Sequence, residues 1–362
     1  MGLWWDERPA YMDASSFQHT GKTDAGGTHQ LAMDFTQMWP PRPTSVKVTA
    51  TVADVNRQQQ SSSTTLLVHP SERYVGLKTE KSFVEDEDDF EFSVVVTDIE
   101  GRILPGVPVE LELLKVDYDG RFRPTERVVE KKSLTSSETP AKVGLSPKDG
   151  GTYHVRASVR DKKGRLNQTE YTLWKAGGKL PSGDKVDEEE LVAVPDKKEY
   201  EPGDTARILV MAPFSEGEGV VVWNRDGILR EERFTLKNGT AVLKLPVTEE
   251  LVPTVGASIT AVGKTSWGAG ERPALATANL DLAISTESRG LTVEIAPGEE
   301  RLEPGSELDI PVVVKDSEGH PVSGAEVTLW AVDEAILGLT GYVTPDALTR
   351  FYAYRPSAVD RR

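Results

Sequence analysis

The sequence contains no cysteine among its 362 residues, and histidine is scarce. Without cysteine, the chain holds no disulfide framework, no zinc ribbon and no thiol nucleophile. The five histidines stand singly, without the spacing of metal ligands. We therefore expect no metal site and no other cofactor. The histidines are His19, His29, His69, His154 and His320.

Basic residues are outnumbered, with 42 Lys and Arg against 58 Asp and Glu, and the formal net charge is -16. A surface of this sign repels polynucleotides and anionic membranes, so we expect no nucleic-acid partner. No apolar run approaches the roughly 18 residues of a membrane-spanning helix, and the first residues lack the basic and apolar regions of a secretory signal. We expect neither a membrane span nor an export signal in this chain.

Catalytic motifs are also missing, because the sequence has no G-x-S-x-G elbow, no phosphate-binding P-loop and no dinucleotide fingerprint. Five consecutive acidic residues, 85–89, could hold calcium through their carboxylates. They lack the spaced ligands and the glycine of a calcium loop, which favours a solvated strand entrance instead. The sequence therefore predicts no catalytic residue and no enzymatic activity.

Apolar and polar residues alternate with a period of two in many short segments, and no long segment carries a helical stripe. Turn clusters such as DIEG, KDGG and KNG separate these segments. Many short strands at this spacing predict an all-β fold made of antiparallel β-sandwiches, of the immunoglobulin or fibronectin type. The expected strands are 45–52, 63–68, 90–96, 107–113, 152–159, 208–211, 219–223, 240–245, 291–295, 308–314 and 325–331.

Three pairs of segments repeat one another along the chain. A repeat of about 100 residues follows, which indicates a tandem array of sandwiches. The pairs are 48–66 with 155–173, 200–210 with 302–312, and 94–111 with 312–329.

The repeats also assign each segment a place in its domain. We expect the closing part of one sandwich, two whole sandwiches separated by a Gly-, Ser- and charge-rich linker, and the opening part of a further sandwich. Three or four strands cannot bury both inner faces of a sandwich, so we expect a fragment of a longer polypeptide, or a chain that pairs with one. The corresponding ranges are 1–76, 77–176, 177–189 for the linker, 190–286 and 287–354.

The last part of the chain changes its period. After the expected strand 325–331, Asp333 is suited to cap a helix, and Ile336 and Leu339 form an apolar i, i+3 pair before a glycine. Asp346 is a second candidate cap, followed by Leu348, Phe351 and Tyr352 on one helical face. We therefore predict two short helices.

The stretch TLWAVDEAILGLTGYVTPDALTRFYAYRP, residues 328–356, resembles the alpha-2-macroglobulin family, particularly its bacterial branch. The resemblance extends over about residues 28–360 and implies that the sandwiches are macroglobulin-like domains. The motif residues are Ala331, Val332, Asp333, Ile336, Leu337, Leu339, Tyr342, Thr344, Pro345, Asp346, Phe351 and Tyr352.

The resemblance implies a function for the segment that follows. In this family a protease-susceptible bait region interrupts one macroglobulin-like domain, so residues 355–362 would begin the bait, with Arg355, Arg361 and Arg362 as cleavage sites for trypsin-like proteases. The implied protein is a broad-spectrum endopeptidase inhibitor of the periplasm or the extracellular space. Its partners would be target endopeptidases and the remaining C-terminal part of the same protein. The family's Cys-x-Glu-Gln thioester is not in this chain.

Two other interpretations stay open. A structural or adhesive β-sandwich array that binds a surface ligand would have the same strands, but its domains should complete seven strands without a helical turn. Accessory sandwiches of a hydrolase would require a catalytic domain elsewhere.

Overall fold

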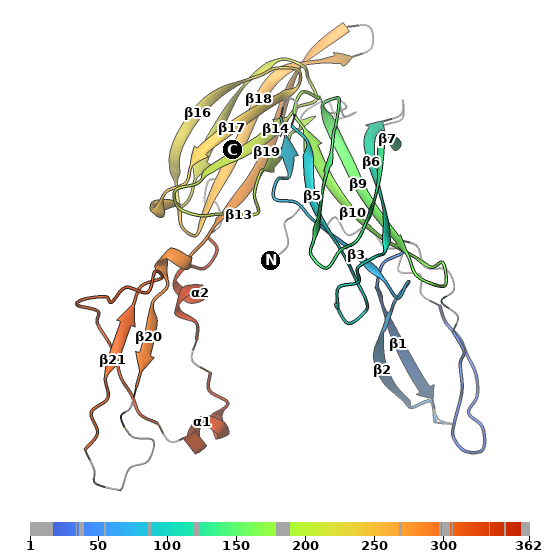
Figure 1. The fold of residues 1–362 in the computed structure, drawn as a ribbon, viewed down its shortest axis with the longest axis vertical. Coiled ribbons are helices and arrows are strands. Elements are labelled where there is room, and N and C mark those ends of the chain that lie inside the picture. The colour runs from blue at the N-terminus through green and yellow to red at the C-terminus, as the bar shows by residue number, and fades with distance from the viewer. Residues whose placement is uncertain are drawn as a thin grey trace. The chain divides into compact units, whose positions relative to one another are not determined.

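The computed structural model describes residues 17–33, 35, 40–53, 56–85, 88–118, 123–178, 189–267, 270–296, 298, 305, 307–332, 334–343 and 345–355. Antiparallel strands dominate these residues, which confirms the all-β fold class (Figure 1). The chain divides into two compact units. The first is Met1–Pro181 with Asn238–Thr240, and the second is Ser182–Lys237 with Ala241–Arg362.

The first unit starts its regular structure with a hairpin of β1 (Thr44–Ala53) and β2 (Gln59–Val68), paired from Thr44 opposite Val68 to Ala53 opposite Gln59. Within the described residues this hairpin is a two-stranded sheet by itself. Apolar side chains such as Val52 and Leu67 are consequently exposed. The hairpin has the strand pattern of a sandwich without a second sheet to cover it.

A complete sandwich follows in the same unit. One sheet has the order β4 (Phe83–Val84), β10 (Leu166–Lys175), β9 (Gly151–Arg160), β6 (Pro108–Tyr118) and β7 (Pro124–Thr135). The other has the order β3 (Tyr74–Lys78), β5 (Phe90–Thr97) and β8 (Ala141–Leu145). Strand β3 runs across the expected boundary between residues 76 and 77.

Alternation of side chains places the core of this sandwich between its two sheets. Every second residue of β5 and β9 is buried, including Phe92 in β5 and Tyr153 and Val155 in β9. Their neighbours along each strand face outward because successive side chains of a strand point to opposite faces. The period-two prediction for residues 90–96 and 152–159 is confirmed.

The second unit contains another complete sandwich. Its larger sheet has the order β11 (Glu189–Glu190), β19 (Gly270–Ile284), β18 (Thr254–Trp267), β15 (Gly217–Asn224) and β16 (Ile228–Leu236), with β13 (Glu199–Tyr200) also paired to β19. The smaller sheet joins β12 (Val192–Pro195), β14 (Thr205–Met211) and β17 (Thr240–Pro246). Trp223, Tyr200 and Phe214 are fully buried in the core between them. Two 3-10 turns, η1 (Glu249–Leu251) and η2 (Glu287–Arg289), lie in the connections that follow β17 and β19.

The last part of the second unit contains a hairpin and two helices. The hairpin joins β20 (Thr292–Ile295) to β21 (Val312–Lys315), and the helices are α1 (Glu334–Thr340) and α2 (Ala347–Phe351). Neither helix is long or apolar enough to cross a membrane.

The expected strand at 325–331 is wrong, because these residues form no strand, and the expected strand 308–314 is reduced to β21. The reason lies in pairing. The repeat counterpart of this segment, β6, is hydrogen-bonded to β7 on one side and to β9 on the other. Segment 325–331 has no such neighbour among the described residues, so its period-two sequence forms no strand.

One turn recurs in both units. Asp98 accepts from the Gly101 amide and its own amide donates to the Arg102 carbonyl, and Asp316 makes the same pair of bonds with Gly319 and His320. The two glycines have φ values of 83° and 84°, in the left-handed region that glycine adopts at little cost. The sequence repeat between 94–111 and 312–329 therefore has the same structure in both segments at this turn.

Candidate functional site

The predicted bait-entrance motif lies in the second unit, between β21 and the end of the described chain. Ala331 and Val332 belong to the segment without regular structure that precedes α1, and Tyr342 is exposed between the two helices. Pro345 and Asp346 immediately precede α2. Asp333, Thr344, Arg361 and Arg362 lie outside the described residues, whereas Arg355 is the last residue described.

Asp346 caps α2 as its position in the sequence predicted. Its carboxylate accepts from the Leu348 amide at 3.1 Å and the Thr349 amide at 3.3 Å, and also from the Thr349 hydroxyl. These bonds satisfy amides that have no partner within the first turn of a helix. The hydrogen bond from the Thr349 hydroxyl, assisted by those amides, lowers the pKa of Asp346 against the opposing effect of burial. Both short helices are confirmed.

Residues around and after α2 contact the complete sandwich of the same unit. Tyr352 is partly buried and packs against its core. The Tyr354 hydroxyl donates to the Asp281 carboxylate on β19. Arg355 places Nη1 3.8 Å from Oδ2 of Asp226, in the turn between β15 and β16. The predicted cleavage residue Arg355 is therefore in an ion pair.

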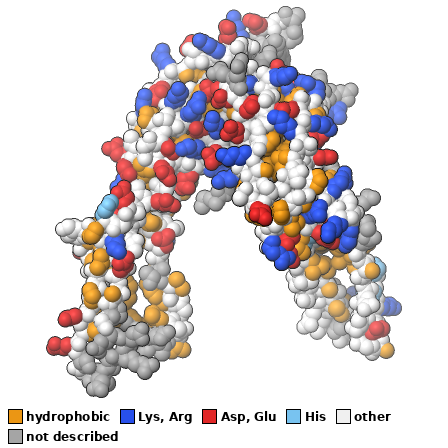
Figure 2. All heavy atoms as spheres, viewed as in Figure 1, with side chains coloured by type: hydrophobic (Ala, Val, Ile, Leu, Met, Phe, Trp, Pro, Cys, Tyr) orange, Lys and Arg blue, Asp and Glu red, His pale blue; other side chains and the backbone are white. Residues whose placement is uncertain are grey.

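Apolar side chains of β20, β21 and segment 325–332 are at the surface (Figure 2). Val293 and Leu329 are each 53% exposed and Trp330 is 60% exposed. The repeat counterpart of Leu329 in the first sandwich is Leu111, which is fully buried. These segments thus have core residues of a sandwich at a place where no second layer covers them among the described residues.

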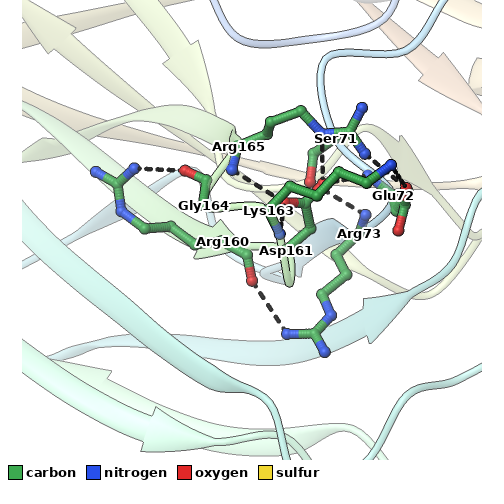
Figure 3. Close-up of polar contacts among 8 residues, drawn as sticks. All are labelled: Ser71, Glu72, Arg73, Arg160, Asp161, Lys163, Gly164 and Arg165. Atoms are coloured by element: carbon green, nitrogen blue, oxygen red, sulfur yellow. Dashed lines mark hydrogen bonds and ion pairs between the residues drawn. The ribbon is translucent and has the colours of Figure 1, made fainter.

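A second group of polar contacts joins the first hairpin to the first sandwich (Figure 3). Its centre is Asp161, at the end of β9, whose side chain is only 1% exposed. One carboxylate oxygen accepts from the Lys163 and Arg165 amides at 2.9 Å each. The other accepts from Arg165 Nε at 2.7 Å and from the Glu72 amide at 3.2 Å. Burial would raise the pKa of Asp161, but these hydrogen bonds outweigh it and lower the pKa to about 2.

The loop between β2 and β3 is held on the β9–β10 hairpin by further bonds. Glu72 accepts from Lys163 Nζ at 3.0 Å and Arg165 Nη2 at 2.8 Å, and Arg73 Nη1 donates to the Arg160 carbonyl at 3.1 Å. These residues, drawn together in Figure 3, form the clamp, which we define as Glu72, Arg73, Arg160, Asp161, Lys163 and Arg165. The clamp fixes the chain where it enters the first sandwich.

A cluster on the outer face of the first sandwich brings together Glu126, His154 and Glu170 from three strands, within 4.8 Å of one another. His154 Nδ1 lies 2.8 Å from Glu126, and Arg156 Nη2 lies 2.8 Å from Glu126 and 2.7 Å from Glu170. Burial opposes ionisation of Glu126, but hydrogen bonds from His154 and Arg156 lower its pKa. Because Arg156 pairs with both carboxylates, the arrangement is that of an ion-pair network.

Neither the clamp nor this cluster was anticipated from the sequence. The clamp joins Glu72 to Asp161, which are 89 residues apart, and the cluster crosses strands β7, β9 and β10. One available signal was the outward-facing alternation of His154 and Arg156 in β9. No local spacing shows which residues of other strands lie opposite.

The model of the alpha-2-macroglobulin bait region domain matches residues 191–339. That match begins at the second sandwich and ends in α1. The alpha-2-macroglobulin homolog of Nostoc sp. is 28% identical over 98% of this chain, and the homolog of Deinococcus radiodurans is 29% identical over 73% of it. Native alpha-2-macroglobulin of E. coli aligns in three dimensions with 17% identity and a TM-score of 0.32, covering 86% of this chain and 21% of that one.

The chain corresponds to a minor part of these relatives. It spans 19% of the Nostoc protein and 26% of the Deinococcus protein. The residues that match the bait region domain include most of the second sandwich and the hairpin of β20 and β21, whose apolar side chains are exposed.

Proposed function

Because the chain belongs to the alpha-2-macroglobulin family, we propose that it is the part of an endopeptidase inhibitor that leads from two macroglobulin-like sandwiches into a protease-cleaved bait segment. The observation that carries this proposal is the change of structure after β21. A strand sequence whose inward-facing apolar side chains are buried in the first sandwich recurs with its apolar side chains exposed, and it runs into two short helices instead of a closing hairpin. A structural array of sandwiches would be expected to complete each domain without such an interruption.

The proposed mechanism is mechanical. Downstream residues of the same protein would cover β20, β21 and segment 325–332, with the bait between the two halves of that domain. Cleavage of the bait would release the constraint between the halves and allow a rearrangement that encloses the protease. The chain itself would have no enzymatic role. Its partners would be target endopeptidases and the rest of the protein, in the periplasm or outside the cell.

The three proposed cleavage residues are not equivalent. Arg355 precedes Pro356, and trypsin-like proteases cut such bonds poorly because proline has no amide hydrogen and a fixed φ. Arg361 is followed by Arg362 and not by proline, so the bond after Arg361 lacks this protection. We therefore propose Arg361 and Arg362 as the cleavage residues.

The proposal implies domain limits that follow the strands. The hairpin β1–β2 would close one macroglobulin-like domain, β3 to β10 would form the next, and β11 to β19 the third. Residues from about 287 would open the fourth. The first limit then falls before β3, in the loop held by the clamp, instead of at residue 76.

A trapping assay tests the function. The full-length protein is incubated with trypsin, and trypsin activity is measured on a small peptide substrate and on a large protein substrate. We expect activity on the large substrate to be lost while activity on the small one persists. Arg361→Gln with Arg362→Gln should abolish this difference for trypsin, and Arg350→Gln should leave it unchanged. Equal inhibition of both substrates, or no inhibition by the wild-type protein, would refute a trap.

A further inference from the structure

We infer that residues 348–355, which we call the anchor segment, fix the upstream end of the proposed bait to the second sandwich and set where a protease can first cut. The role in cutting rests on the proposed function. The attachment itself stands on contacts of the described residues.

Four residues of the anchor segment lie at one end of the sandwich, and three of them make direct contacts with it. A Cβ added to Gly290 would lie 3.8 Å from Leu348 Cδ1, so this leucine lies beside the connection after η2. Tyr352 packs on the core, Tyr354 donates to Asp281, and Arg355 pairs with Asp226. The contacts therefore continue from α2 to the last described residue.

The surface around the Tyr354 acceptor is shaped by a glycine. In the larger sheet Asn224 lies opposite Gly256, which in turn lies opposite Asp281. A Cβ on Gly256 would lie 2.5 Å from Asn224 Oδ1, closer than real contacts allow, and 3.1 Å from Asp281 Oδ1, which is tight. The missing side chain thus leaves room for both polar groups on the outer face. Asn224 is completely buried, and its Oδ1 has no hydrogen-bond partner among the described residues.

This end of the sandwich is braced by arginines. Arg225, next to Asp226, donates to the Val252 carbonyl at 2.9 Å and to the Glu250 carbonyl at 2.5 Å. Arg289 in η2 pairs with Glu249 at 2.9 Å. The hydrogen bonds from the charged Arg225 side chain hold the β15–β16 turn to the connection between β17 and β18. Asp226 therefore lies in a turn that these bonds hold, and Asp281 lies within the paired strand β19.

The anchor segment has a consequence for protease specificity. Proteolysis of a folded segment requires local opening, so a closed anchor shields the bond after Arg350 and the bonds after its two tyrosines. The bond after Arg355 leads to proline and is resistant. The first readily cut bonds for a trypsin-like protease then follow Arg361 and Arg362. Seven residues reach at most about 25 Å, so the cut would occur close to the second sandwich.

The test uses limited trypsin digestion of the 362-residue chain, with the rate of cutting after Arg350 followed by mass spectrometry. Tyr354→Phe removes only the hydroxyl, and Asp281→Asn removes the charge of its acceptor. Tyr354→Phe should accelerate this cut about five- to tenfold, since a hydrogen bond to a charged group is lost. Asp281→Asn should accelerate it less, since the amide oxygen can still accept a neutral hydrogen bond. The double variant should be no faster than Tyr354→Phe alone, because both substitutions act on the same bond. Tyr342→Phe, between the two helices and outside the anchor segment, should cut at the wild-type rate.

Rates for Tyr354→Phe equal to those for Tyr342→Phe would overturn the anchor. An unchanged thermal unfolding midpoint of the second sandwich in both variants excludes a general loss of folding. The digestion contains no trapping step, so its result does not depend on whether the proposed function is right. Failure of the full-length protein to trap trypsin, with the expected rates at Arg350, would refute the inhibitor and leave the attachment standing.

Discussion

The Nε atom of Arg165 donates to the buried carboxylate of Asp161 across 2.7 Å, and the same carboxylate oxygen accepts the amide of Glu72, 89 residues earlier in the chain. A charge at this position is favourable because donors from both the turn and the entering loop surround it. The turn of Asp98 has the corresponding in-turn bonds, from the Arg102 amide at 2.9 Å and Arg102 Nε at 2.7 Å. Asp161 differs by its bond to the entering loop.

This relationship predicts the effect of Asp161→Asn on stability. The difference between the ordinary pKa of 3.8 and about 2 corresponds to about 2 kcal/mol of stabilisation of the first sandwich. We expect a loss of that size, measured by hydrogen exchange of the β9 and β10 amides. Asp98→Asn is the matched control and should cost less, because the Asp98 side chain is more exposed. Equal effects of the two variants would contradict a special role for the clamp.

The same carboxylate predicts a pH dependence. The pKa of Asp161 is lowered by folding, so its contribution is complete above pH 3.8 and is lost as the pH falls through about 2. Acid unfolding of the wild-type first sandwich should steepen in this range, and Asp161→Asn should remove that part of the slope. Circular dichroism titrations of the two proteins from pH 5 to pH 2 provide the measurement. Parallel curves would show that other carboxylates dominate.

Tyr354 predicts a change at the opposite end of the pH scale. The hydrogen bond to Asp281, with smaller effects of burial and of the aspartate charge, raises the pKa of Tyr354 to about 12. The contribution of this group is therefore complete below pH 10 and disappears as the pH rises through about 12. The absorbance difference at 295 nm between wild type and Tyr354→Phe isolates this titration. In an Asp281→Asn background its midpoint should move toward 10, whereas an unchanged midpoint would deny the contact.

The ion-pair network on the first sandwich should have a modest, salt-dependent effect. Arg156→Gln leaves Glu126 and Glu170 without their shared cation, and the cost should be about 0.5–1 kcal/mol because the side chains are partly exposed. Chemical denaturation at low salt and at 1 M salt measures it. The cost should shrink at high salt, since screening weakens exposed charges. Arg102→Gln, whose partner lies in an exposed turn, is the control and should cost less.

The repeat supplies a matched pair of core substitutions. Leu111→Ala removes a fully buried side chain and should destabilise the first sandwich by about 2–5 kcal/mol. Leu329→Ala, at the counterpart position, should change the stability of this chain by less than about 0.5 kcal/mol, because that side chain is exposed. Denaturation curves of both variants measure the difference. In a longer protein that completes the fourth domain, Leu329→Ala should become costly, and a continued absence of effect would argue against completion.

Features set by local sequence were predictable. Alternation in residues 90–96 and 152–159 identified buried faces, because a strand with one covered side needs that period. Asp346 identified the start of α2, since capping depends on residues within the next turn. The expected strand at 325–331 had the right period and failed, because a strand also requires a paired neighbour.

Features that join distant segments were not predictable. The bond between Tyr354 and Asp281 crosses 73 residues, and nothing in either neighbourhood specifies the other. The long strands β18 and β19 were also missed. Each exceeds the length of an ordinary strand and carries small and polar residues, such as Gly256 and Asn279, that interrupt a simple alternation. Their pairing with each other stabilises them over 14 positions.

The most direct measurement is the position of the first trypsin cut in the full-length protein, determined by mass spectrometry alongside mobility on a native gel. A single rapid cut after Arg361 or Arg362, accompanied by faster migration, is the result we expect from a bait that releases a constrained domain. Slow cutting within residues 177–191, with no change in migration, would contradict the proposed trap and favour a passive array of β-sandwiches.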